Sequence, residues 1–210
     1  MPTSKSFGII LAGGLSRRMG GGNKSLRMLG GRPLLARAAG ALRPQCDGLL
    51  LSANGDPAAY AAFGLPTVAD DVEGFKGPLA GVLAGLDWIA VHFPDLEYAI
   101  SAPADTPFLP ADLVVRLTDA RAENGAVIVC GGSGGRVHPL VALWPVAIRE
   151  DLRHALVYED LRKVQDFQQG YRRATVEWTV EPFDPFFNVN EPGDLAAAES
   201  LLLWTETHSA

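Results

Sequence analysis

The feature that most constrains the fold is an apolar run that breaks into glycines, in the stretch FGIILAGGLSRRMGGGNK from Phe7 to Lys24. The run Phe7–Leu11 is typical of a parallel strand that helices cover on both faces. Glycines after such a strand let backbone N–H groups approach an anion, and Arg17, Arg18 and Lys24 supply positive charge. The stretch predicts a buried strand and a loop that binds nucleotide phosphates. The alternative is a flexible glycine loop with solvated arginines.

Two common phosphate-binding patterns do not fit this stretch. A GxxxxGK[ST] loop needs glycine directly before its lysine, and Asn23 precedes Lys24. The dinucleotide pattern GxGxxG fails because Gly13 and Gly14 are adjacent.

Further apolar runs alternate with helical patterns along the chain. Strands are expected near residues 49–51, 66–68, 98–101, 126–130, 139–144 and 175–180, and helices near 33–42, 57–62, 79–93, 112–123, 146–156, 160–168 and 192–203. A loop is expected at 131–135 and a short extended piece at 186–189. This alternation predicts an α/β fold, a three-layer sandwich with a mostly parallel sheet. With 210 residues the chain is expected to be one domain, residues 1–210, with a nucleotide-binding half of about 1–110 and an acceptor-binding half of about 111–210.

Composition limits the partners. The net charge is −6 and the pI about 5.2, so no general basic field attracts nucleic acid. No apolar run reaches the length of a membrane span, and no signal peptide is visible. The cysteines, Cys46 and Cys130, show no metal-binding spacing and are expected to be reduced. We expect a cytoplasmic monomer without membrane or nucleic-acid partners. Four tryptophans are expected mostly in the core: Trp88, Trp144, Trp178 and Trp204.

Polar residues follow the ends of the first four expected strands. Ser52 and Asn54 follow the second strand, Asp70 the third and Asp105 the fourth. Ligands of open α/β sheets bind beyond the carboxyl ends of the strands. If these strands are neighbours, the side chains converge with the glycine loop in one crevice.

Asp105 is the candidate metal ligand of this crevice. Magnesium prefers one or two carboxylates together with phosphate oxygens and water. The alternative is that Asp105 caps the helix that begins near Pro110. Asp70 and Asp71 are adjacent, so their side chains diverge, and Asp70 is the one expected in the crevice; a solvated turn is the alternative.

Asn188 and Asn190 bracket Val189, so an extended backbone places both amides on one face. They can contact a ligand or a metal-bound water, or Asn190 can cap the helix that Pro192 opens. His138 is expected to hydrogen-bond or to dock substrate, since no nucleophile motif accompanies it.

Four motifs now support a family resemblance: LAGGLSRRMGGGNK at Leu11–Lys24, GPLAG at Gly77–Gly81, DTPF at Asp105–Phe108 and NVN at Asn188–Asn190. In order and spacing, over nearly the whole chain, they resemble the molybdenum cofactor guanylyltransferases. These belong to a wider nucleotidyltransferase group with a Rossmann-like sheet of the nucleotide-diphospho-sugar transferase, or glycosyltransferase-A-like, kind.

The resemblance implies transfer of GMP from GTP to the terminal phosphate of molybdenum-bound molybdopterin, with pyrophosphate released and Mg²⁺ as cofactor. Transient contacts with proteins that build the cofactor or receive it are implied too. The alternatives are a cytidylyltransferase acting on the same pterin, a sugar-phosphate or isoprenoid nucleotidyltransferase, and a regulatory nucleotide-binding module without catalysis.

Roles for individual residues follow from the motifs. The residues expected to serve catalysis are Lys24, Asp105 and Arg17. Those expected to contact the nucleotide are Leu11, Ala12, Gly13, Gly14, Lys24, Ser52, Asn54, Asp70 and Asp105. Acceptor contacts are expected from Arg136, His138, Asn188 and Asn190, and from Lys163. Ser52 departs from the family's usual Asn, and Asn23 from its common Asp.

Overall fold

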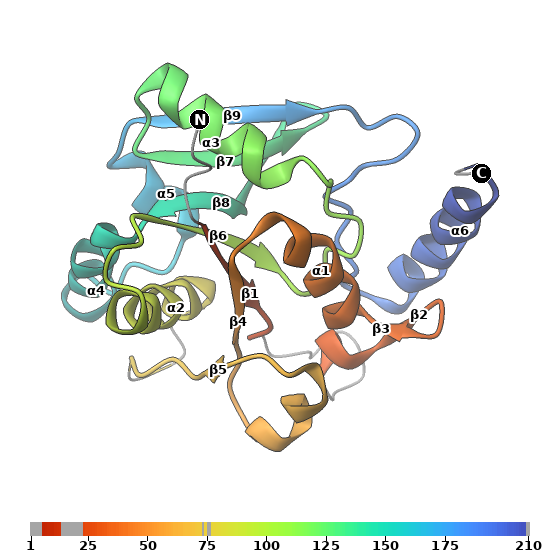
Figure 1. Ribbon diagram of the computed structural model, residues 1–210, viewed down its shortest axis with the longest axis horizontal. Coiled ribbons are helices and arrows are strands. Elements are labelled where there is room, and N and C mark those ends of the chain that lie inside the picture. The colour runs from red at the N-terminus through yellow and green to blue at the C-terminus, as the bar shows by residue number, and fades with distance from the viewer. Residues whose placement is uncertain (1–5, 14–22, 73, 75–76, 209–210) are drawn as a thin grey trace.

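The computed structural model describes residues 6–13, 23–72, 74 and 77–208. Its main sheet has seven strands in the order β5-β4-β1-β6-β8-β7-β9 (Figure 1). The strands are β1 (Phe7–Leu11), β4 (Gly48–Ser52), β5 (Thr67–Val68), β6 (Tyr98–Pro103), β7 (Ile128–Ser133), β8 (Arg136–Pro145) and β9 (Arg173–Trp178). Neighbours pair in parallel except where β8 meets β6 and β7. The predicted mostly parallel sheet is confirmed, and its first four strands are neighbours.

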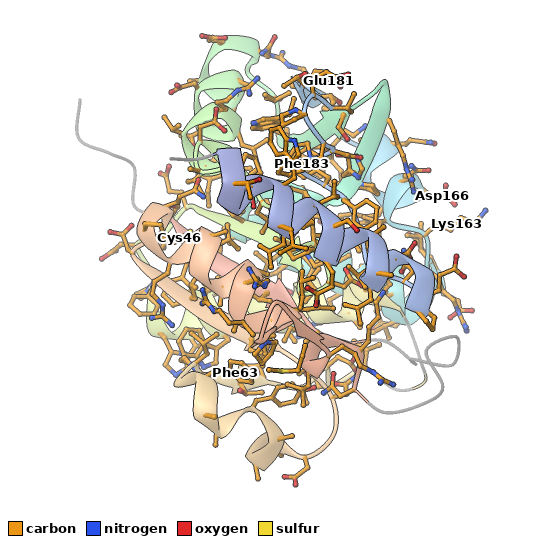
Figure 2. All side chains as sticks on the ribbon, turned by 90° about the vertical axis from the view of Figure 1, so that its right-hand side faces the viewer. Cys46, Phe63, Lys163, Asp166, Glu181 and Phe183 are labelled. Carbon is orange, nitrogen blue, oxygen red and sulfur yellow. The ribbon has the colours of Figure 1, made fainter. Side chains whose placement is uncertain are left out.

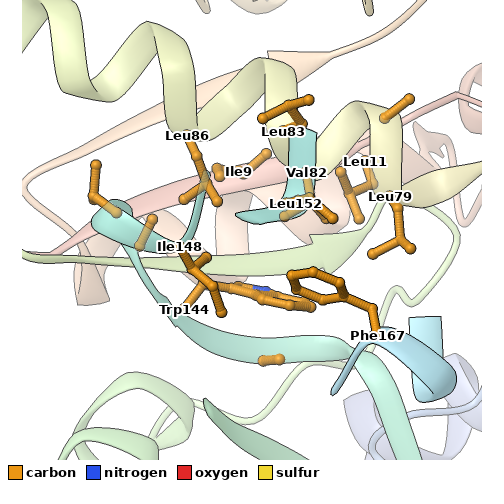
Figure 3. Close-up of a cluster of buried hydrophobic side chains, with 14 of the residues drawn as sticks. Ile9, Leu11, Leu79, Val82, Leu83, Leu86, Trp144, Ile148, Leu152 and Phe167 are labelled. Atoms are coloured by element: carbon orange, nitrogen blue, oxygen red, sulfur yellow. The ribbon is translucent and has the colours of Figure 1, made fainter. Parts of the chain in front are cut away.

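Helices cover both faces of this sheet, so the predicted three layers are present. The α-helices are α1 (Leu34–Leu42), α2 (Pro78–His92), α3 (Leu113–Asn124), α4 (Arg149–Tyr158), α5 (Val164–Gln169) and α6 (Pro192–His208). Single turns of 3-10 helix are η2 (Lys24–Leu26), η3 (Arg43–Gln45) and η5 (Val146–Ile148), with a longer one at η4 (Pro57–Phe63). One buried cluster joins the sheet to α2, α4 and α5, and the other joins it to α1 and α3. The close-up in Figure 3 shows Trp144 and Phe167 beneath the apolar side of α2.

Glycines let α2 lie directly on the sheet. A Cβ atom at Gly85 would stand 2.7 Å from Cδ1 of Ile9, and one at Gly81 would stand 2.7 Å from Oγ of Ser52. The helix therefore approaches β1 and β4 more closely than a side chain would allow. This contact brings the N-terminus of α2 to the strand ends.

Two antiparallel hairpins depart from the sequence expectation. Residues Gly131–Ser133, expected in a loop, belong to β7 and pair with the start of β8. Gly134 and Gly135 turn the chain with φ of 56° and 75°, which suits a two-residue hairpin. A second hairpin, β2 (Met28–Leu29) with β3 (Arg32–Pro33), turns in the same way at Gly30 and Gly31.

The last helix packs on this N-terminal hairpin. Leu29, Leu34, Val189 and Ala198 form a small buried cluster, and Glu199 Oε1 accepts a hydrogen bond from the Gly30 N–H at 2.9 Å. Helix α6 lies at the outer side of α1 and the hairpin (Figures 1 and 2). Its Trp204 is 40% exposed, so the prediction of a core position is wrong for that tryptophan. Across the described ranges, no helix combines the length and the apolar character that crossing a membrane requires.

Candidate functional site

A pocket lies where β4, β1 and β6 end, at the edge that the sequence indicates. Eight of its lining residues are predicted site residues: Leu11, Gly13, Ser52, Asn54, Asp70, Asp105, Asn188 and Asn190. The backbone ladder continues past the strand ends and holds these residues together. Ala12 N–H donates to Ser52 O at 2.8 Å, and Ala104 N–H donates to Leu11 O at 2.9 Å. The predicted convergence at one sheet edge is therefore confirmed in position.

Lys24 contacts two lining residues of this pocket, Asp105 and Asn190. Nζ of Lys24 lies 2.5 Å from Oδ2 of Asp105 and donates to Oδ1 of Asn190 at 2.7 Å. The Lys24 and Asp105 side chains are only 18% and 21% exposed. This pair is therefore shielded from water more than a surface ion pair, and its mutual attraction is less screened. The Asp105 side chain thus pairs with Lys24 and does not cap the following helix, which was the alternative.

The residue before the lysine fixes the start of its short helix. Asn23 is the N-cap of η2, and its Oδ1 accepts from the Ser25 N–H at 3.1 Å and from the Ser25 hydroxyl at 2.7 Å. Its amide nitrogen also donates to the Tyr60 hydroxyl. The Asn23 side chain thus orders the backbone that carries Lys24.

Two buried oxygens in the pocket have no hydrogen-bond partner among the described residues. They are Oδ1 of Asp105 and Oδ1 of Asn188. The loop that carries Asn188 is tied to Asp105, because the Val189 N–H donates to the Asp105 carbonyl oxygen at 3.0 Å. An unpartnered buried acceptor costs about 1–3 kcal/mol, so two of them at one site fit a bound cation or donor. Within the described part of the chain, no cluster of three or more His, Cys, Asp or Glu side chains could hold a metal by itself.

Asp70 and Asn54 form a reciprocal pair on the opposite side of the pocket. Asn54 Nδ2 donates to Oδ2 of Asp70 at 2.6 Å, and the Asp70 N–H donates to Oδ1 of Asn54 at 3.1 Å. Asp71 points elsewhere, with its Oδ2 at 3.7 Å from Nη1 of Arg153. The expected divergence of the two aspartates is observed, and Asp70 is the one that lines the pocket.

The structure corrects one expectation. Asn190 does not cap α6 as expected, because its side-chain oxygen accepts from Lys24 while Asp194 Oδ2 accepts from the Asn190 N–H at 2.7 Å. The Ala12 N–H donates to Ser52 O, and the contact of Ala12 with the nucleotide stays a prediction. Gly14, Arg17 and Arg18 lie outside the described residues.

The remaining acceptor candidates are not among the pocket's lining residues. His138 Nε2 lies 2.7 Å from the Ser133 hydroxyl, and its ring packs on Phe186 with centroids 4.8 Å apart. Burial lowers the pKa of His138, against the opposing effect of the Asp184 carboxylate. Arg136 is exposed, and Lys163 lies at the periphery in Figure 2.

Six lining residues were not predicted to contact a ligand: Ala53, Gly77, Pro78, Gly81, Pro103 and Leu140. The GPLAG motif was itself the signal for Gly77, Pro78 and Gly81. Leu140 had no signal, since a leucine in an apolar strand pattern indicates core.

Known proteins similar to this chain define its class as a nucleotidyltransferase. The model of the MobA-like NTP transferase domain matches residues 8–174, and the chain belongs to this family of nucleotidyltransferases. A molybdenum cofactor guanylyltransferase from Rhodopseudomonas palustris (strain BisB5) is 61% identical over 195 residues, which cover 93% of each chain. The predicted family is thereby confirmed.

Solved structures share the fold. Molybdopterin-guanine dinucleotide biosynthesis protein A from Archaeoglobus fulgidus has a TM-score of 0.72 at 23% identity, over 94% of this chain and 99% of that one. A Mycobacterium tuberculosis H37Rv protein solved in complex with manganese has a TM-score of 0.67 at 16% identity, over 93% and 98%.

Proposed function

We propose that the protein transfers GMP from GTP to the terminal phosphate of molybdenum-bound molybdopterin. An oxygen of that phosphate forms a bond to the α-phosphorus of GTP, and the bond from the α-phosphorus to the bridging oxygen breaks. Pyrophosphate leaves with the electron pair, and molybdopterin guanine dinucleotide forms. The observation that carries the proposal is the Lys24–Asp105–Asn190 contact in a strand-end pocket of a chain so similar to guanylyltransferases.

Lys24 supplies positive charge for the phosphates in this mechanism. Its ammonium group is held in place by Asp105 and Asn190 before substrate arrives. Such a fixed donor stabilises the charge that develops on departing pyrophosphate without reorganising first. The attacking phosphate is already ionised at neutral pH, so the pocket needs no strong general base. Arg17 is proposed to assist the leaving group.

A divalent cation, Mg²⁺ in our proposal, fits the two unpartnered oxygens. Asp105 and Asn188 would hold it, since carboxylate and amide oxygens are the ligands that Mg²⁺ prefers. When bound, it neutralises phosphate charge and orients the reacting groups. We assign Asp105 as its one carboxylate ligand, since Asp70 is paired with Asn54, and the remaining ligands come from phosphate and water.

The nucleoside and the acceptor are assigned to different sides. Asn54 and Asp70 follow β4 and β5, and we place the nucleoside against them, together with Leu11, Gly13, Gly14 and Ser52. Asn188 and Asn190 lie on the opposite side, toward the acceptor, with Arg136, His138 and Lys163 further along it. The protein is proposed to act as a cytoplasmic monomer that meets its cofactor-building and cofactor-receiving partners transiently.

The test is a parallel measurement with GTP, CTP, ATP and UTP. Each nucleotide is incubated with Mg²⁺ and molybdopterin, and both pyrophosphate and dinucleotide are quantified. We expect both products with GTP and a clear preference for GTP in binding titrations. A preference for CTP would instead favour the cytidylyltransferase alternative, and nucleotide binding without pyrophosphate release would favour a regulatory module.

A further inference from the structure

Strand β8 carries an irregularity next to the pocket. Ala142 pairs with Cys130 on β7 and with Ser101 on β6, but the next pair along β7 is Gly131 with His138. While β7 advances by one residue, β8 advances by four, so residues 139–141 bulge out of the register. Bulges next to active sites commonly redirect a side chain, and here the middle residue, Leu140, lines the pocket.

Buried polar side chains fix the bulge in one conformation. The Ser101 hydroxyl donates to the Leu140 carbonyl oxygen at 2.7 Å and accepts from Trp144 Nε1–H at 2.8 Å. On the other side, Gln168 Nε2 donates to the Pro139 carbonyl oxygen at 2.8 Å. Ser101, Trp144 and Gln168 are all 0% exposed. A fully satisfied buried network specifies a single arrangement, because any other would leave polar groups unpaired.

The sheet order tells which substrate Leu140 faces. Asp70 and Asn54 follow β5 and β4, Asp105 follows β6, and Leu140 is on β8 beyond it. Leu140 thus stands on the side of Asp105 away from the proposed nucleoside contacts. Its side chain also packs against the buried cluster under α2, which restricts its motion.

We infer that Leu140 forms an apolar wall of the acceptor site, and that Ser101 and Gln168 are the positioning residues that hold it there. The inference rests on the proposed guanylyl transfer. The acceptor chemistry it fits is a flat heteroaromatic ring linked to a phosphate: the phosphate reaches the Lys24–Asp105 centre while a ring face covers Leu140. Apolar walls with a few placed polar groups are the usual way to select such ligands.

The test measures the KM for molybdopterin and the KM for GTP independently. Leu140→Ala is expected to raise the KM for molybdopterin by roughly 3- to 10-fold, the loss expected from part of an apolar contact. The variant removes no nucleotide contact, so the KM for GTP should stay within about twofold of wild type. A tenfold change would correspond to about 1.4 kcal/mol.

Ser101→Ala tests the positioning network and has a matched control. The variant removes the hydrogen bond to Leu140, and we expect the same rise in the molybdopterin KM as for Leu140→Ala. Trp144→Phe removes the other bond to the same hydroxyl but leaves the Ser101–Leu140 bond intact. It should lower the melting temperature without changing the molybdopterin KM, which separates positioning from general destabilisation.

Each result bears on a different claim. A Leu140→Ala enzyme with normal KM for molybdopterin, or with a raised KM for GTP alone, would overturn the inference while guanylyl transfer stands. Equal effects of Ser101→Ala and Trp144→Phe on the molybdopterin KM would remove the positioning role. A wild-type protein that makes no dinucleotide from GTP and molybdopterin would overturn the proposed function and this inference together.

Discussion

At the scale of single residues, one side of the pocket brings together the ammonium of Lys24, the carboxylate of Asp105 and the amides of Asn188 and Asn190. Lys24 and Asp105 neutralise one another at 2.5 Å in the structure, which avoids an isolated charge in a half-buried site. Oδ1 of Asn190 accepts a further hydrogen bond from Lys24 Nζ. Oδ1 of Asn188 and Oδ1 of Asp105 have no partner among the described residues. The roles that we propose for these groups act on charge rather than on covalent chemistry, so each loss should affect turnover far more than folding.

Lys24→Ala and Asp105→Ala are each expected to lower turnover by about 100-fold or more, since each removes charge stabilisation at the transferring phosphate. Circular dichroism should stay that of the wild type, because both side chains lie at the pocket rather than in the core. Dinucleotide formation is the measurement. Asp119→Ala, an exposed aspartate of α3, is the matched control and should retain full activity. Wild-type turnover in either pocket variant would contradict the assignment.

His138 predicts a pH dependence of stability. Burial lowers its pKa in the folded protein, Arg136 adds to this, and Asp184 and Glu177 oppose it. The unfolded chain therefore binds the proton first on acidification, so stability is complete above the ordinary histidine pKa of about 6.5 and falls as the pH drops through it. His138→Gln, which retains a hydrogen-bonding group toward Ser133, should reduce that fall.

The measurement is urea unfolding of both proteins at pH 7.5 and pH 5.5. We expect the wild type to lose more stability than the variant between the two pH values. An identical loss in both proteins would show that His138 is not the titrating group.

At the scale of elements, the approach of α2 to the sheet places the GPLAG motif against the strand ends. Gly81 meets Ser52 and Gly85 meets Ile9 at distances that exclude a Cβ atom. The same contact serves the core and the pocket, because Gly81 lines the site while Gly85 lies one turn further into the cluster.

Gly85→Ala should destabilise the protein even though alanine is the better helix former. Alanine gains about 1 kcal/mol of helix propensity. Overpacking against the fully buried Ile9 costs about 1–3 kcal/mol. Gly40→Ala on α1 is the matched control, because its Cβ would meet only the end of Arg32 at 3.5 Å. Denaturant unfolding should show Gly85→Ala less stable and Gly40→Ala more stable than wild type; the opposite order would contradict the packing account.

Most elements could be predicted from the sequence, because strand and helix periods are local and strong. Phe7–Leu11 and Pro78–His92 follow their apolar patterns closely. The β7–β8 hairpin was missed because Gly131–Ser133 resemble loop residues, although Ser133 pairs with Arg136. The bulge that presents Leu140 depends on Ser101 and Gln168, 39 and 28 residues away in the chain, and no local pattern records such a contact.

The positions of the candidate site residues could also be predicted from the sequence, but their contacts could not. Residues at strand ends, such as Asp70 and Asp105, could be predicted because sheet topology fixes where parallel strands end. The hydrogen bonds among these side chains could not be predicted. Asn190 is indistinguishable from a helix cap by position alone, and only the folded chain shows that its oxygen faces Lys24.

At the scale of the whole molecule, the pocket joins strands of the N-terminal half to a loop near the C-terminus. GTP with Mg²⁺ should therefore stabilise the whole fold. At 100 times the dissociation constant, linkage gives about 2.7 kcal/mol. For a chain of this size that corresponds to roughly 5–10 °C in melting temperature.

Thermal unfolding with GTP, with and without Mg²⁺, measures this effect. Chelation of the metal should remove much of the shift, and Asp105→Ala should respond to GTP equally with and without Mg²⁺. A wild-type shift that does not depend on the metal would contradict the assignment of Asp105 and Asn188 to a cation.

The contact between Lys24 and Asn190 spans 166 positions of the chain, and the Val189 N–H and Glu199 then tie the C-terminal segment to Asp105 and Gly30. During synthesis, the lysine and the aspartate leave the ribosome long before the amides that complete their surroundings. A product that stops short of the NVN motif would keep most of the sheet but lack this part of the pocket. We therefore expect chains that end before Asn188 to make no dinucleotide, so that activity would arise only after synthesis has passed the NVN motif.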